Sequence, residues 1–187
     1  MQGLNDLTHL KTLDLGANRI RKMEGLSSLT SLESLWLGKN KIEKIENIST
    51  LATLRQLDIQ NNRLVDLPCS ESGRDDDMRS LGSLKELYLA CNAISVIRGL
   101  PLALETVDLS TNKISDIAYL SHLRGLKEVW MTASLLGSFE DLTPLRELPL
   151  LECLYLEHSP VAHLEDYKQR VLEMLPTLQQ LDAESTS

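Results

Sequence analysis

The chain repeats a pattern of leucines about every 22 residues, and this repeat constrains its fold more than any other feature. Segments of the form LxxLxL or a close variant, such as LKTLDL and LESLWL, open at seven positions: Leu10, Leu32, Leu54, Leu84, Leu104, Leu126 and Leu151. The spacings between them are 22, 22, 30, 20, 22 and 25 residues. A unit this short cannot bury its apolar side chains alone, so neighbouring units must stack.

The repeats match the LxxLxLxxN signature of leucine-rich repeats, which contribute one short strand each. In LKTLDL, strand alternation points Leu13 and Leu15 inward and Thr12 and Asp14 outward. The return segments keep apolar residues three apart, a spacing that favours 3₁₀ turns over an α-helix. The sequence therefore predicts one domain over residues 1–187, an α/β repeat solenoid of the leucine-rich-repeat horseshoe type with a parallel concave sheet and a 3₁₀-rich convex side.

An asparagine recurs at the end of each strand segment in five repeats: Asn18, Asn40, Asn62, Asn92 and Asn112. An amide at this point can bond backbone groups where the chain turns off the strand, which predicts a ladder joining adjacent repeats. Ser134 and Ser159 occupy the same place in the last two repeats, so we expect the ladder to weaken toward the C-terminus.

Three segments depart from the regular repeat. Residues 68–80 form a polar inserted loop, in which the run Asp75 to Asp77 is interpreted as a solvated surface rather than a metal site. Residues 164–182 are predicted to be the C-terminal cap, with an amphipathic α-helix that ends before Pro176. The chain opens midway through a repeat, so we expect further repeats upstream in the natural protein.

Composition and charge exclude several function classes. With 27 acidic and 19 basic residues the net charge is −8, which opposes phosphate contacts and hence nucleic acid binding. Neither a membrane span nor a secretory signal is visible, and the three cysteines fit neither a disulfide framework nor a zinc site. The four histidines fall in no catalytic motif, and no phosphate-binding loop is present. We expect a cytoplasmic or nuclear protein that is not an enzyme and needs no cofactor or metal.

The outward position between the second and third leucines of each strand is the candidate binding site. Down the seven repeats it holds Asp14, Trp36, Asp58, Tyr88, Asp108, Trp130 and Tyr155. Four of the seven aromatic residues of the chain fall in this one column, and the neighbouring outward column adds Glu86 and Glu128. Aromatic side chains on a rigid exposed surface are typical of interface hot spots. The pattern predicts a protein partner with basic and apolar groups; alternatively, some of the rings only pack against one another.

The sequence also resembles a known family. The 22-residue repeats with isoleucine at the turn, NRIRKMEGLSSL and NKIEKIENISTL, are similar to the class typified by the leucine-rich-repeat regulatory subunit of type-1 protein phosphatase. The segments LKEVWMTASLLGSFEDLTPL, LECLYLEHSP and DYKQRVLEMLPTLQQLDA are similar to the last two repeats and cap of that subunit. The resemblance implies a non-catalytic subunit whose concave face grips the phosphatase catalytic subunit and controls its activity or assembly.

Carried over by position, the resemblance implies six contact residues: Asp14, Trp36, Asp108, Glu128, Trp130 and Tyr155. The chain departs from the family in its insertion, in its serines at the ladder position and in having fewer repeats. The same repeat class also serves axonemal, cytoskeletal and spliceosomal adaptors, so an adaptor for another protein is the alternative. An enzyme is a distant third hypothesis.

Overall fold

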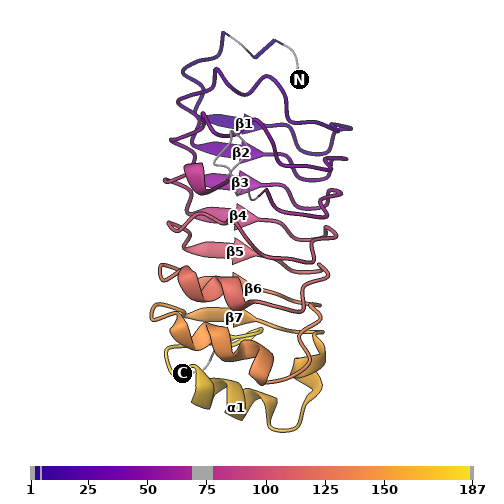
Figure 1. Ribbon diagram of the computed structural model, residues 1–187, viewed down its shortest axis with the longest axis vertical. Coiled ribbons are helices and arrows are strands. Elements are labelled where there is room, and N and C mark those ends of the chain that lie inside the picture. The colour runs from indigo at the N-terminus through magenta and orange to yellow at the C-terminus, as the bar shows by residue number, and fades with distance from the viewer. Residues whose placement is uncertain (1–2, 5, 69–77, 186–187) are drawn as a thin grey trace.

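Seven short parallel strands, one from each repeat, stack in sequence order along the long axis of the molecule (Figure 1). The computed structural model describes residues 3–4, 6–68 and 78–185. The strands are β1 (Thr12–Asp14), β2 (Ser34–Trp36), β3 (Gln56–Asp58), β4 (Glu86–Tyr88), β5 (Thr106–Asp108), β6 (Glu128–Trp130) and β7 (Cys153–Tyr155). The predicted leucine-rich-repeat fold, with an open parallel sheet, is confirmed.

The register of the sheet is set by the inward side chains. The middle residues of successive strands pair directly: Leu13, Leu35, Leu57, Leu87, Val107, Val129 and Leu154. From Leu35 onward these side chains are fully buried in one continuous apolar core. Because side chains alternate along a strand, this register also aligns the outward residues into straight columns.

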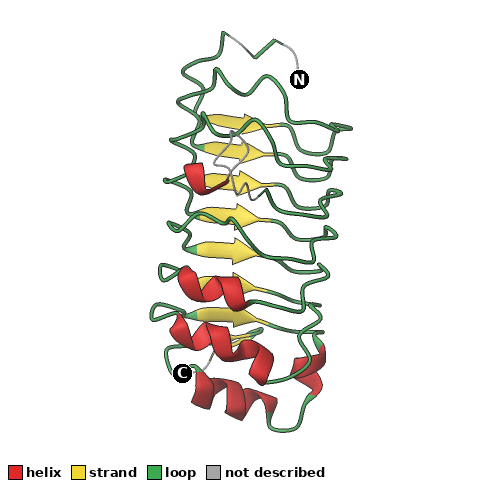
Figure 2. Cartoon of the chain, viewed as in Figure 1, coloured by secondary structure: helices red, strands yellow, loops and turns green. Residues whose placement is uncertain are grey.

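The convex side changes character along the chain (Figure 2). In the first repeats it consists of single turns, where the N–H groups of Leu29 and Leu32 bond the carbonyls three residues earlier. Later repeats carry the 3₁₀ helices η1 (Met78–Ser80), η2 (Ala118–His122), η3 (Glu140–Glu147) and η4 (Pro160–His163). The prediction of 3₁₀ structure is thus confirmed for the later repeats, whereas the early ones hold only isolated turns. Residues 69–77 of the predicted insertion, including the aspartate run, lie outside the described residues.

The asparagine ladder is present, and Asn112 shows its geometry. Its Nδ2 donates to the carbonyls of Leu109 and Ser110 in its own turn (2.9 and 3.2 Å) and to Leu89 of the preceding repeat (3.0 Å). Its Oδ1 accepts the N–H of Ile94, also in the preceding repeat, at 3.0 Å. One side chain therefore satisfies four backbone groups and ties two repeats together.

The serines at the ladder position behave differently from each other. Within the described residues the Ser134 hydroxyl bonds Ser159 Oγ (2.9 Å) and Leu136 N–H (3.4 Å), and neither bond reaches the preceding repeat. Ser159 Oγ does reach back, donating to the carbonyl of Met131 at 3.1 Å. The predicted weakening is confirmed at Ser134 and wrong at Ser159.

The C-terminal end combines a helix with an extension of the sheet. Helix α1 (Tyr167–Met174) begins three residues after the predicted Leu164, whose side chain is exposed. Strand β8 (Gln180–Leu181) pairs in parallel with β7, and β9 (Glu184–Ser185) pairs antiparallel with β8. The buried carboxylate of Asp182 accepts the N–H groups of Leu156 and Glu157 at 2.7 and 3.0 Å. The carboxylate of Asp182 thus replaces the strand carbonyl that accepts the equivalent N–H in earlier repeats, as Trp130 O accepts Leu109 N–H.

The ladder yields a stability prediction. Asn112→Ala should lower the free energy of unfolding by about 2 kcal/mol or more, because it leaves several buried backbone groups without partners. Asn18→Ala removes only two bonds at an exposed position, to Leu15 and Gly16, and serves as the matched control with a smaller loss. Urea denaturation followed by circular dichroism measures both, and equal losses would contradict the role given to Asn112.

Candidate functional site

The sheet face, defined as the outward side of β1–β7 with the next outward position after each strand, is acidic. Its carboxylates are Asp14, Asp58, Glu86, Asp108, Glu128 and Glu157. None of the outward positions holds a lysine or arginine; the other residues there are Thr12, Gly16, Ser34, Trp36, Gly38, Gln56, Gln60, Tyr88, Ala90, Thr106, Ser110, Trp130, Thr132, Cys153 and Tyr155. A large part of the net negative charge of the chain therefore lies on this one face.

Two acidic side chains beside the sheet, Glu33 and Glu105, form ion pairs, in contrast to the carboxylates on its face. Glu105 lies between Lys85 and Lys127, with nitrogen-to-oxygen distances of 2.8 Å to each. Hydrogen bonds from Lys127 and then Lys85 lower the pKa of Glu105 to about 2. Lys11 pairs with Glu33 in the same column. In the described part of the chain, no ion pair involves a carboxylate of the sheet face, so that charge is available to a partner.

The three aspartates of the predicted column also stabilise the turns that follow their strands. Asp14, Asp58 and Asp108 each accept, through Oδ1, the backbone N–H two residues later, at 2.8 to 2.9 Å. Such side-chain caps are a common use of aspartate in turns. Asp108 is only 8% exposed, which corrects the expectation that it faces solvent. Asp14 is exposed and Asp58 half-buried.

Polar contacts fix two of the aromatic residues. The indole N–H of Trp36 donates to Gln56 Oε1 at 2.8 Å, and Gln56 Nε2 donates to Glu86 at 2.8 Å. The hydroxyl of Tyr88 donates to the same carboxylate at 3.0 Å. Burial, followed by the hydrogen bond to Glu86, raises the pKa of Tyr88 to about 12. This chain of contacts crosses β2, β3 and β4 and restricts the rotamers of both rings.

Three aromatic residues of the column, Tyr88, Trp130 and Tyr155, form an aromatic cluster. The Tyr88 and Trp130 ring centroids are 6.1 Å apart, although β5 separates their strands, and Trp130 and Tyr155 meet edge to face at 6.0 Å. The rings of Tyr88 and Trp130 thus meet above Asp108, which explains its burial. Ring packing is thus present among these three residues, whereas Trp36 of the same column stands apart from them.

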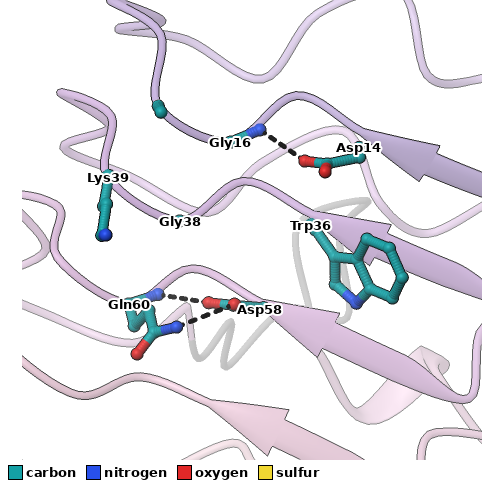
Figure 3. A pocket seen from close by; sticks show the side chains of 8 residues that line it. Asp14, Gly16, Trp36, Gly38, Lys39, Asp58 and Gln60 are labelled. Carbon is teal, nitrogen blue, oxygen red and sulfur yellow. Dashed lines mark hydrogen bonds between the residues drawn. The ribbon is translucent and has the colours of Figure 1, made fainter.

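Two hollows interrupt the face. One of about 250 Å³ is lined by Ser110, Trp130, Thr132 and Tyr155 beside the aromatic cluster. The other, of about 340 Å³, lies over β1–β3; Figure 3 shows Asp14, Trp36 and Asp58 around it, with Gly16 and Gly38 to their left, farther along the chain. Neither hollow was predicted from the sequence. The next outward position after the strand is glycine only in the first two repeats, and this pattern is the sequence signal for the hollow over β1–β3.

The structure places the seven residues of the predicted column and Glu128 on one face, but it exposes their side chains to different extents. Trp36 is 37% exposed, while Tyr88, Glu128, Trp130 and Tyr155 are half-buried. Gln56, which accepts the indole N–H of Trp36, and Gln180, which donates to the Tyr155 hydroxyl, are the positioning residues that the sequence did not identify. The described residues contain no group of three His, Cys, Asp or Glu side chains arranged to hold a metal. No helix in the described ranges is long and apolar enough to cross a bilayer.

The two sides of the sheet should respond differently to truncation. Leu109 is fully buried, so Leu109→Ala should lower the free energy of unfolding by about 2–5 kcal/mol. Trp130 is half-buried and mainly loses ring contacts, so Trp130→Ala should lower it by about 1 kcal/mol. Chemical denaturation compares the two, and an equal or larger loss at Trp130 would contradict the assignment of strand faces.

Comparison with known proteins agrees with this architecture. Residues 8–50 and 30–74 match the model for leucine-rich repeats in two copies. The chain is 34% identical over 98 residues to mouse cilia- and flagella-associated protein 410, covering 50% of this chain and 38% of that protein. It is 38% identical over 71 residues to protein phosphatase 1 regulatory subunit pprA of Dictyostelium discoideum, covering 38% of this chain and 21% of that protein.

Similarity to solved structures extends over nearly the whole chain. An internalin, InlF of Listeria monocytogenes, is 28% identical, with a TM-score of 0.76 over 98% of this chain and 50% of that one. The chain spans less than two fifths of the length of the two relatives above, so it corresponds to a part of each. The repeat signature, the open parallel sheet and these similarities together establish a leucine-rich-repeat fold.

Proposed function

We propose that the chain is a non-catalytic binding module whose sheet face docks a folded protein, the catalytic subunit of protein phosphatase 1. The observation that carries the docking role is the segregation of charge: Glu33 and Glu105 beside the sheet form ion pairs, and in the described part of the chain no carboxylate on its face does. A basic partner surface would supply the missing cations. Seven strands give a rigid platform roughly 30 Å long, long enough for a standard protein interface.

The phosphatase assignment is supported by two observations. The segment LKEVWMTASLL carries Glu128 and Trp130 as the resemblance requires, and Tyr155 follows at the matching place in the next repeat. A relative that shares the repeats is named as a regulatory subunit of protein phosphatase 1. On this proposal the aromatic cluster supplies the apolar anchor of the interface, and Glu86 and Glu128 pair with cations around it.

A second candidate is an adaptor for a ciliary or cytoskeletal protein. The similarity to mouse cilia- and flagella-associated protein 410 over half of this chain favours it. Such an adaptor would use the same sheet face, because the acidic and aromatic side chains lie there whatever the partner. The two candidates differ in whether the phosphatase catalytic subunit binds at all.

Calorimetric titration of the purified chain with the phosphatase catalytic subunit tests the proposal. We expect submicromolar affinity that weakens about tenfold or more in Trp130→Ala, corresponding to a hot-spot contribution. Leu102→Ala is the matched control, because Leu102 is an exposed apolar side chain in the turn before β5 and lies outside the sheet face. No binding by the folded chain would reject the phosphatase, and unchanged affinity in Trp130→Ala would reject the site.

A further inference from the structure

We infer that the hollow over β1–β3 is a subsite for one arginine side chain of the partner. The inference rests on the proposed function only in that the occupant belongs to a protein bound on the sheet face. The hollow lies apart from the aromatic cluster, and the resemblance implies contact residues there without describing a cavity. The inference states which ligand chemistry that cavity fits. The hollow is defined by Asp14, Trp36, Asp58, Gly16 and Gly38, with Ala17, Lys39 and Gln60 on its rim.

The shape of the hollow follows from register and from two missing side chains. Asp14, Trp36 and Asp58 pair directly across β1, β2 and β3, which places the indole between the two carboxylates. At the next outward position the first two repeats carry Gly16 and Gly38, whereas later repeats carry larger residues. A Cβ atom at Gly38 would lie 3.3 Å from Asp58 Oδ1. The glycines therefore leave open the space beside both carboxylates.

The charge of the hollow is unbalanced. Asp14 uses one oxygen to cap Gly16 N–H, and its other oxygen has no hydrogen bond among the described residues. Asp58 accepts the N–H and the side-chain amide of Gln60, at 2.9 and 3.0 Å, and keeps lone pairs for a further donor. Lys39 stands on the opposite rim and forms no ion pair with either carboxylate (Figure 3). Two negative charges, with the single positive charge of Lys39 on the rim, thus face an open space beside an exposed ring.

Arginine fits this arrangement better than the other cations. A guanidinium is planar and can lie against the indole face while its N–H groups reach carboxylates on either side. The bond to Gln56 holds the indole in place before the partner arrives, which lowers the entropic cost of binding. Lysine offers a single compact charge without the stacking plane. A divalent cation would need more oxygen ligands than the two aspartates provide.

The test uses Trp36 as its own reporter. The chain has two tryptophans, so Trp130→Phe leaves Trp36 as the only indole, and its N–H signal can be followed by nitrogen-15 NMR. Titration with acetyl-arginine amide at constant ionic strength should give a saturable shift of that signal, and acetyl-lysine amide should bind several-fold more weakly. Calcium chloride, titrated in the same way, should produce no saturable shift.

Paired variants identify the carboxylates. Asp14→Asn and Asp58→Asn keep the oxygen that caps the backbone N–H but remove the charge, so the turns should persist while arginine affinity falls about tenfold. Asp116→Asn is the matched control, because Asp116 caps Ala118 N–H at 2.8 Å away from the sheet face. The subsite is rejected if arginine and lysine shift the signal equally, if calcium saturates it, or if Asp116→Asn weakens binding as much.

The outcome is independent of the phosphatase assignment. If the chain binds arginine saturably but does not bind the phosphatase catalytic subunit, the subsite is retained and that partner is rejected. Conversely, phosphatase binding that Trp130→Ala weakens and Asp14→Asn leaves unchanged, together with no arginine binding, would retain the proposed function and reject the subsite.

Discussion

The rest of the structure depends on the burial of leucine between adjacent repeats. No repeat encloses its own apolar side chains; each is covered by the next, and the core from Met23 to Leu181 is continuous. Burial fixes the register of every strand, because a shift by one residue would turn the leucines into solvent. The same register aligns the outward residues into columns. The proposed binding surface is therefore a geometric consequence of the core, since the strand register fixes where the outward residues lie.

A surface made in this way is free to vary in chemistry without cost to the fold. The inward residues provide the apolar stabilisation, so the outward ones can be acidic or aromatic. Each outward aspartate still contributes locally, because it caps the turn after its strand through one oxygen. The second oxygen of Asp14 remains for a partner, whereas that of Asp58 also accepts the side-chain amide of Gln60. Structural and binding roles thus share one carboxylate, and replacement by asparagine separates them.

The sequence predicted the features that follow from periodicity and missed those that follow from side-chain volume and direction. Strand positions, the inward leucines and the outward column all follow from the spacing of LxxLxL. Periodicity does not tell that Tyr88 and Trp130 would meet above Asp108, because ring contacts across an intervening strand depend on rotamers. Nor does it identify Asp182 as the cap of β7, since a side-chain carboxylate there replaces the strand carbonyl that accepts the equivalent N–H in earlier repeats.

Backbone conformation supplies a further example of what periodicity hides. The residue just before each ladder position has a left-handed φ of 53° to 62°, in Ala17, Lys39, Asn61, Cys91, Thr111, Ala133 and His158. Only Asn61 and His158 are of types that favour this region. The turn brings the ladder side chain against the backbone, and Asn112 shows the gain that offsets this strain, because its side chain bonds four backbone groups. The hollow over β1–β3 lies beside two of these turns, at Ala17 and Lys39, so the turns that carry the ladder side chains also form part of the rim of the proposed arginine subsite.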